Sequence, residues 1–244
     1  MYSERSKTKV VQSTREDAAT TRFSEQSFLF VPGSRPDRFE RALESGADAV
    51  ILDLEDAVEP SAKDTSREHV ANWVSRRHPV LVRINGRATP WFERDARLGA
   101  LDGVAGLVLP KAEQAEDVTS TVALARRRIP VFPLIESARG MWNAMEIAKA
   151  PFVRRLLFGT LDFIAEMGID DDGASLNHYR AQLALISRVA GIETPVDGVT
   201  PGGFKSEAQQ GVIEWKLRLS KRLRAYARRP RMANEMHVWH EVGC

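Results

Sequence analysis

Two acidic residues each follow a short apolar run and could together bind a metal ion. Glu136 comes directly after the run Val131–Ile135, and Asp162 comes shortly after Leu156–Gly159. Two carboxylates at neighbouring strand ends can share a hard divalent cation whose other positions are filled by water. We therefore predict a magnesium site at Glu136 and Asp162, with manganese as the alternative metal. Taken singly, either carboxylate could instead cap a helix or pair with a surface arginine.

A cation and a cluster of acids follow two other apolar runs. Arg83 lies near the end of Pro79–Ile84, where a permanently charged guanidinium must find an anion. A substrate carboxylate is one such anion and Asp53, Glu55 or Asp56 is another, and both pairings can hold at once. Along an extended chain Asp53 and Glu55 point to the same side, whereas Asp56 can face a metal-bound water or a helix terminus. We predict that these four residues are catalytic; the simpler alternative is that Glu55 orients Arg83 and Asp56 caps a helix.

A turn after the first apolar run is a candidate for binding the substrate. Pro32, Gly33 and Ser34 join that run to a helical segment, where glycine allows close backbone approach and a helix N-terminus favours an anion. Asn85 lies two residues after Arg83 and adds a polar side chain to the same set. We predict that these four polar or turn residues contact the substrate together with Arg83.

Lys111 follows the run Val104–Leu109 and completes the predicted substrate-binding set. Its ammonium group could bind a carboxylate or a phosphate, or form a Schiff base if its pKa were lowered. A solvated or ion-paired lysine is the simpler alternative. The sequence has no Walker glycine loop, no GxGxxG motif that opens a helix, and no Cys or His cluster with zinc spacing.

The elements that must position these residues alternate between short apolar runs and helical patterns. Such alternation predicts parallel strands joined by crossover helices, here a TIM-type (β/α)8 barrel whose C-terminal end is incomplete or altered. In a barrel the carboxyl ends of the strands gather at one face, so these distant charges become neighbours. The predicted strands are Ser27–Val31, Ala47–Leu54, Pro79–Ile84, Val104–Leu109, Val131–Ile135, Leu156–Gly159 and Val196–Val199. The predicted helices are Arg35–Ser45, Ser61–Arg76, Trp91–Gly99, Ala112–Arg128, Arg139–Ala148 and Ser175–Ala190.

Composition indicates an ordinary globular chain with one large domain. Its 244 residues are 43% hydrophobic and 28% charged, with a formal net charge of +2, which does not favour nucleic acid as a partner. Cys244 is the single cysteine, so no intrachain disulfide can form and we expect a cytoplasmic protein. No apolar run is long enough to span a membrane. We predict a flexible tail over residues 1–24, a barrel domain over 25–200 and a basic, helical segment over 201–244.

The motifs at the strand ends together resemble the HpcH/HpaI aldolase and citrate lyase superfamily, in particular its citrate lyase β-subunit-like branch. The resemblance implies a magnesium-dependent lyase in which Glu136 and Asp162 bind the metal and Arg83 holds the carboxylate of a keto acid. It also implies citryl-, malyl- or citramalyl-type coenzyme A thioesters as substrates and a homo-oligomer, a trimer. The motifs that carry it are SFLFVPGSRP (27–36), ILDLEDAV (51–58), VRIN (82–85), LPK (109–111), LIES (134–137) and FGTLDF (158–163).

After Thr200 the sequence departs from the family pattern. The family has an eighth strand with a Cys-Ile-His-Pro-like ending, which is not recognisable here. Instead, Phe204–Arg231 holds nine Lys or Arg against Glu207 and Glu214 and could form an amphipathic helix. Two other functions therefore stay open: a barrel that binds a keto acid without turnover or acts through its basic tail, and an aldolase that uses a Lys111 Schiff base.

Overall fold

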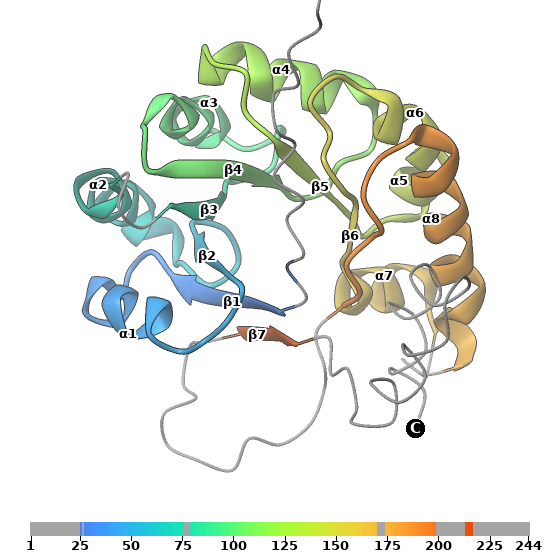
Figure 1. The fold of residues 1–244 in the computed structure, drawn as a ribbon, viewed down its shortest axis with the longest axis horizontal. Helices are drawn as coiled ribbons and strands as arrows, with labels where there is room; N and C mark the ends of the chain where they lie inside the picture. Colours follow the sequence, from blue (N-terminus) through green and yellow to red (C-terminus); the bar gives the residue numbers. More distant parts are fainter. Residues whose placement is uncertain (1–24, 26, 76–78, 170–173, 199–212, 217–244) are drawn as a thin grey trace, which may run out of the picture.

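Six parallel strands form a curled sheet, a half-barrel with helices around its outer side (Figure 1). The computed structural model describes residues 25, 27–75, 79–169, 174–198 and 213–216. The parallel strands are β1 (Ser27–Pro32), β2 (Ala49–Asp53), β3 (Val80–Arg83), β4 (Val104–Leu109), β5 (Val131–Ile135) and β6 (Leu157–Phe158). Each pairs with the next in sequence order, which confirms the predicted α/β fold with a parallel sheet.

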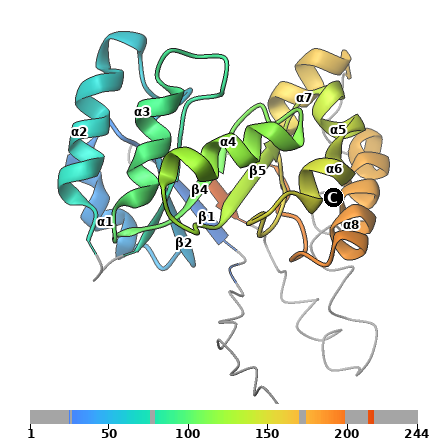
Figure 2. The same ribbon diagram turned by 90° about the horizontal axis from the view of Figure 1, so that it is seen from above.

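The helices between the strands lie side by side around the sheet (Figure 2). Most predicted helices occur but are shorter, because several begin with a single 3-10 turn. The segment predicted as one helix over Arg139–Ala148 is two helices that meet at Asn143, and α7 was not predicted at all. The helices are α1 (Phe39–Leu43), α2 (Lys63–Trp73), α3 (Phe92–Ala96), α4 (Ala115–Ala125), α5 (Ala138–Trp142), α6 (Ala144–Lys149), α7 (Thr160–Met167) and α8 (Asn177–Ala190).

Both faces of the curled sheet are apolar, as expected for parallel strands that are covered on each side. On β1, Phe28 and Phe30 point into the barrel interior, whereas Leu29 and Val31 pack against the outer helices. Gly106 on β4 makes room in the interior, because a Cβ atom there would lie only 2.6 Å from the ring of the inner residue Phe132. Alternating side chains thus form two cores from one sheet.

The sheet does not close into a complete barrel within the described residues. After β6, parallel pairing continues only at Val196, which forms an isolated bridge with Leu157 in place of the predicted strand Val196–Val199. On the other edge, β7 (Ile213–Lys216) pairs antiparallel with β1. These four residues lie in the segment predicted to be helical, so that prediction is wrong for them.

Several predictions fall outside the described residues. These are the flexible tail over residues 1–24, Val199 at the end of the predicted seventh strand, and the remainder of the basic segment over 201–244. Within the described part of the chain, no helix is both long enough and apolar enough to cross a membrane.

Candidate functional site

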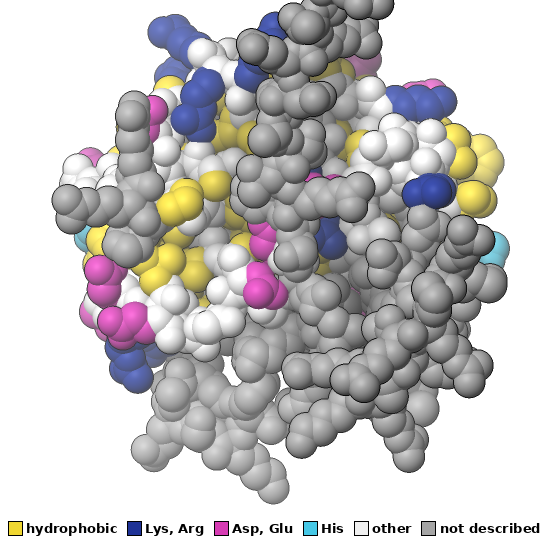
Figure 3. Space-filling model, viewed as in Figure 1, with side chains coloured by type: hydrophobic (Ala, Val, Ile, Leu, Met, Phe, Trp, Pro, Cys, Tyr) yellow, Lys and Arg dark blue, Asp and Glu magenta, His cyan; other side chains and the backbone are white. Residues whose placement is uncertain are grey.

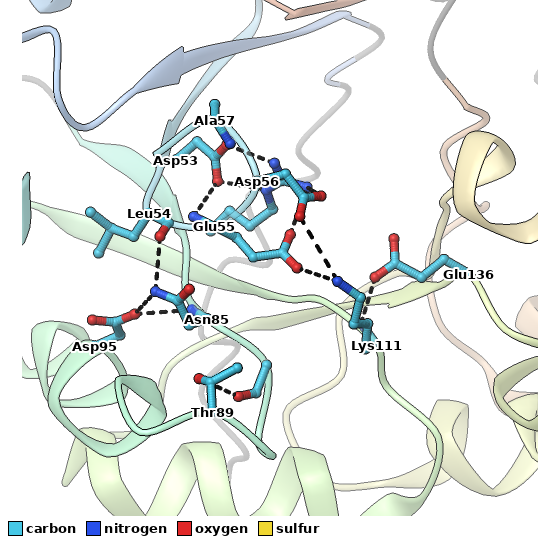
Figure 4. Close-up of polar contacts among 12 residues, drawn as sticks. Asp53, Leu54, Glu55, Asp56, Ala57, Asn85, Thr89, Asp95, Lys111 and Glu136 are labelled. Carbon is cyan, nitrogen blue, oxygen red and sulfur yellow. Dashed lines mark hydrogen bonds and ion pairs between the residues drawn. The ribbon is translucent and has the colours of Figure 1, made fainter. Parts of the chain in front are cut away.

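The predicted site residues gather where β2, β3, β4 and β5 end (Figure 4). Parallel strands place their carboxyl ends on one edge of the sheet, so residues far apart in sequence meet there. Asp53 is the last residue of β2 and Arg83 the last of β3. Lys111 and Glu136 follow β4 and β5 within two residues. Hydrogen bonds and ion pairs connect all four of these strand ends.

Arg83 is held by a two-pronged ion pair with Asp53. Its Nε donates to Asp53 Oδ1 and its Nη2 to Asp53 Oδ2, each at 2.6 Å. Burial lowers the pKa of Arg83, but the adjacent Asp53, Glu55 and Asp56 outweigh burial and raise it above the ordinary value. The internal pairing considered for Arg83 is therefore correct. Its Nη1 faces the other two acids, 3.0 Å from Glu55 Oε2 and 3.5 Å from Asp56 Oδ2.

Glu55 lies between two cations and is almost fully buried. Its Oε1 accepts a hydrogen bond from Lys111 Nζ at 2.8 Å, whereas its Oε2 contacts Arg83 Nη1 without the alignment of a hydrogen bond. Burial raises the pKa of Glu55, and the charges of Arg83 and Lys111 only partly oppose this effect. Asp56 is different, because its side chain is 54% exposed. Glu55 forms an ion pair with Arg83, but the hydrogen bonds that hold the guanidinium come from Asp53, and Asp56 borders the solvent.

Lys111 connects the β2 end of the site with the β5 end. Its main-chain N–H donates to Glu136 Oε1 at 2.7 Å while its Nζ binds Glu55 (Figure 4). Its backbone has a φ of 51°, in the left-handed region that non-glycine residues seldom adopt and that costs free energy. Burial lowers the pKa of Lys111, but the contact with Glu55 outweighs burial and raises it. A Schiff base requires a lowered pKa, so this arrangement does not support that alternative.

Glu136 is the most strongly perturbed carboxyl group of the site. It is 5% exposed, and burial raises its pKa to about 8, with further increases from the charges of Glu55 and Asp162. The Lys111 N–H opposes this shift but does not overcome it. Gly159 packs directly against the group, since a Cβ atom there would lie 2.6 Å from Glu136 Oε2. The fold thus packs a glycine against a buried carboxyl group, and the nearby charge of Lys111 is too weak to offset the burial of that group.

Asp162 lies in the first turn of α7. It is near enough to Glu136 for its negative charge to raise the pKa of that group. It is exposed to solvent. A pair of carboxyl groups, one buried with a raised pKa and one exposed, fits a hard divalent cation that takes oxygen ligands. No cluster of three or more acidic, His or Cys ligands occurs among the described residues, so water or substrate oxygens would complete the coordination.

Asn85 has a different place from the one predicted. Its side-chain amide donates to Leu54 O at 2.8 Å and to Asp95 Oδ2 at 2.6 Å, and the residue is buried. The amide nitrogen therefore ties the end of β3 to the turn after β2 and to α3. This arrangement does not support the predicted substrate contact through the amide nitrogen.

The turn over Pro32, Gly33 and Ser34 also differs from expectation. Gly33 N donates to Asp53 O at 2.7 Å, and a Cβ atom on Gly33 would lie 2.8 Å from Leu54 Cδ2. Glycine is thus required for packing between the ends of β1 and β2. A 3-10 turn follows and α1 has only five residues, so the helix N-terminus gives this turn little of the expected attraction for an anion, and the substrate contact stays a prediction.

Sequence reasoning missed three residues that shape the site. Lys63, the first residue of α2, donates to two main-chain carbonyl groups of the turn after β2. Asp95 on α3 is fully buried and accepts hydrogen bonds from Arg67 and Asn85. Gly159 gives space to Glu136. Only Gly159 lies in a recognisable motif; Lys63 and Asp95 resemble surface helix residues in the sequence.

The exposed surface adds one observation on partners. On the face shown in Figure 3, the described Lys and Arg side chains lie mainly around the edge, whereas hydrophobic and acidic side chains are visible nearer the middle. A patch of positive charge suited to a phosphate backbone does not gather on the described part of this face.

Comparison with known proteins identifies the family of the chain. The model of the HpcH/HpaI aldolase/citrate lyase family matches residues 26–212. A citrate lyase subunit beta-like protein of Deinococcus radiodurans is 31% identical over 205 residues, which cover 76% of this chain and 71% of that protein. An L-malyl-CoA/beta-methylmalyl-CoA lyase of Rhodobacter capsulatus is 35% identical over 208 residues, covering 70% of this chain and 64% of that one.

The fold is similar to that of solved structures as well. The CitE protein of Mycobacterium tuberculosis in complex with magnesium, acetoacetate and coenzyme A superposes with a TM-score of 0.63 and 34% identity, over 75% of this chain and 68% of that one. Sequence and fold therefore lead to the same assignment. The chain belongs to the HpcH/HpaI aldolase/citrate lyase family as a citrate lyase β-subunit-like member, and it is a carbon–carbon lyase, as its strand-end motifs predicted.

Proposed function

We propose that this chain is a magnesium-dependent lyase that cleaves a citryl-, malyl- or citramalyl-type coenzyme A thioester. The products would be an acyl-CoA and an oxaloacetate-, glyoxylate- or pyruvate-like keto acid. The observation that carries the proposal is the connection made by Lys111 between two buried carboxyl groups, Glu55 and Glu136. The substrate class is supported by the malyl-CoA lyase and by the solved relative that holds magnesium, acetoacetate and coenzyme A.

Glu136 and Asp162 are the residues that would hold the metal. Positive charge between them would favour the ionised form of Glu136, whose pKa burial and neighbouring acids raise to about 8. When bound, the metal ion supplies Lewis acidity that polarises a keto-acid oxygen. Gly159 allows the Glu136 side chain to pack directly against the chain at the start of α7, where a Cβ atom would displace it.

Arg83 would bind the carboxylate of the keto-acid part of the substrate. Asp53 occupies its Nε and Nη2, so the Nη1 side is the one that can turn to an incoming carboxylate. Asp56 lies 3.5 Å from Nη1 with a half-exposed side chain, so it can move aside at small cost. The pair with Asp53 fixes the plane of the guanidinium, which gives the substrate a defined orientation.

Glu55 is the candidate for moving the proton. Its pKa is raised by burial, and its Oε2 has no hydrogen-bond partner. A carboxylate with a raised pKa is suited to accept a proton near neutral pH. Glu55 Oε2 would take the proton of the substrate hydroxyl as the carbon–carbon bond breaks. The bonding electrons would leave with the thioester fragment as an enolate, which then takes up a proton to give the acyl-CoA.

The experiment that tests this function is cleavage of citryl-, malyl- and citramalyl-CoA with magnesium and with EDTA. We expect the intact chain to cleave at least one thioester only with magnesium, and Glu136→Ala and Asp162→Ala to lose that activity. Glu116→Ala, which removes an exposed glutamate of α4, is the matched control and should keep it. A folded chain that binds magnesium but cleaves none of the three would contradict the proposal.

We further propose that the protein is a cytoplasmic homo-oligomer, with a trimer as the expected state. Large apolar side chains that are exposed in one chain support an association surface. Trp142 is 86% exposed, and Leu185 and Val189 lie on the solvent side of α8. Light scattering coupled to gel filtration measures the state directly, and a monomer at micromolar concentration would contradict this expectation.

A further inference from the structure

A buried lysine outside the predicted site holds the turn that carries Glu55. Lys63 is 6% exposed, and its Nζ donates to Leu54 O at 2.8 Å and to Glu55 O at 2.7 Å. The same ammonium group lies 5.4 Å from the centre of the Trp91 ring, within the range of a cation–π contact. Both hydrogen bonds of Lys63 thus go to main-chain carbonyl groups of one short segment, the turn after β2.

Asp53 holds the same turn from the amide side. Its Oδ1 accepts a hydrogen bond from Glu55 N at 2.8 Å, and its Oδ2 accepts one from Ala57 N at 3.1 Å (Figure 4). Carbonyl groups of the turn thus point to a cation and amide groups to an anion. The peptide group between Leu54 and Glu55 is thus held on both sides, its carbonyl by Lys63 and its amide by Asp53, which restricts its rotation more than either charge alone.

The orientation of this turn decides where the Glu55 carboxylate lies. Glu55 reaches Arg83 and Lys111 within ion-pair distances, so a small rotation of its main chain would move it away from one of them. Keeping an ammonium group buried is costly: burial lowers the pKa of Lys63, against the opposing effect of Asp53 and Glu55. The two carbonyl groups also have other donors, Asn85 Nδ2 and Val58 N, so the lysine is not needed merely to satisfy them.

We propose that Lys63 is a positioning residue of the lyase reaction, which fixes the turn after β2 so that Glu55 meets Arg83 and Lys111 in the reactive geometry. Lys63 reaches no residue of the predicted metal pair, so its effect falls on the substrate half of the site. The catalytic part of this inference rests on the proposed function, whereas its structural part does not.

Lys63→Met tests the inference because methionine keeps most of the side-chain volume and removes the charge. We expect kcat/KM for the cleaved thioester to fall about 10- to 100-fold, since small misplacements of reacting groups have effects of this size. The magnesium affinity, measured by calorimetry with the metal alone, should change much less than kcat/KM, because this turn acts on Glu136 only through the charge of Glu55 and makes no hydrogen bond with it. Hydrogen exchange of the Glu55 and Ala57 amides should become about tenfold faster relative to Leu107 in β4.

Arg154→Met is the matched control. Arg154 is a mostly buried cation paired with Glu193 before β6, at the opposite end of the strands from the site. An equal loss of kcat/KM in both variants would overturn the inference, because it would indicate general destabilisation. Unchanged exchange of Glu55 and Ala57 in Lys63→Met would overturn it as well.

Lys63→Gln is the second variant if the methionine variant yields too little folded protein. Glutamine keeps a shorter NH2 donor without the charge, so we expect a smaller change in the same amides and in kcat/KM. Wild-type exchange and kinetics in Lys63→Gln would then overturn the inference. If the intact chain cleaves none of the thioesters, the proposed function fails, while the exchange experiment still decides whether Lys63 fixes the turn.

Discussion

Replacing Glu136 by glutamine changes one charge in the buried part of the site and almost nothing else. The glutamine side chain has nearly the same shape, and its oxygen can accept the 2.7 Å hydrogen bond that Lys111 N donates to Glu136 Oε1. The substitution therefore isolates the effect of the ionised carboxylate. Two measurements then report on this one charge: the free energy of unfolding without metal, and the affinity for magnesium.

The magnitude follows from the pKa of Glu136, which rises from 4.5 to about 8 in the folded chain. The folded state holds this proton more tightly than the unfolded state does. The stability from Glu136 is thus fully present below its unfolded pKa of 4.5 and is lost as the pH rises through the folded pKa of about 8. The rise from 4.5 to about 8, at about 1.4 kcal/mol for each tenfold change in proton affinity, sets an upper limit of about 5 kcal/mol.

Urea unfolding of the metal-free protein in EDTA measures this difference. Near pH 4.5, the two proteins should have similar free energies of unfolding, whereas above about pH 8, Glu136→Gln should be more stable by on the order of 2–5 kcal/mol. Magnesium at about 100 times its Kd should reduce this difference by about 2.7 kcal/mol, because the bound ligand stabilises only the protein that binds it. The exposed Glu116→Gln is the control. Parallel pH profiles for wild type and Glu136→Gln would refute the reasoning.

Three other substitutions test separate parts of the site. Gly159→Ala should weaken magnesium binding at least about tenfold by calorimetry, because its Cβ would lie 2.5 Å from Glu136 Cβ. Gly86→Ala is the control and should not weaken it, because the nearest contact of its Cβ would be at 3.8 Å. Arg83→Lys loses the two-pronged pair and should lower kcat/KM about 100-fold, which corresponds to on the order of 3 kcal/mol. Wild-type kinetics in this variant would argue against carboxylate binding by Arg83. Lys111→Met should lower kcat/KM without abolishing magnesium binding, because the main-chain N–H that binds Glu136 remains. Borohydride with a keto acid should trap no adduct in the intact chain; a trapped adduct would restore the Schiff-base alternative.

The order of strands and helices could be predicted because it depends on local patterns. The apolar runs that form β1 to β5 are flanked by turn residues, and parallel pairing in sequence order follows from the crossover helices between them. α7 was missed because Thr160–Met167 follows a glycine at a strand end, where the sequence suggests a loop. Its helical state depends on tertiary packing: Phe163 stacks edge-on against Phe158 and Tyr179.

The sequence alone determined which charged groups meet, namely Asp53, Glu55, Arg83, Lys111 and Glu136, because parallel strands bring their carboxyl ends to one edge. Only the tertiary structure decided how they pair. Asp53 occupies two of the nitrogens of Arg83, Lys111 uses a left-handed backbone to reach Glu136, and Lys63 enters from a helix. Such pairing depends on ångström-scale distances and on burial, and a pattern of residue types contains neither. Distance and burial set the pKa of Glu136 and the side of Arg83 that can bind a substrate.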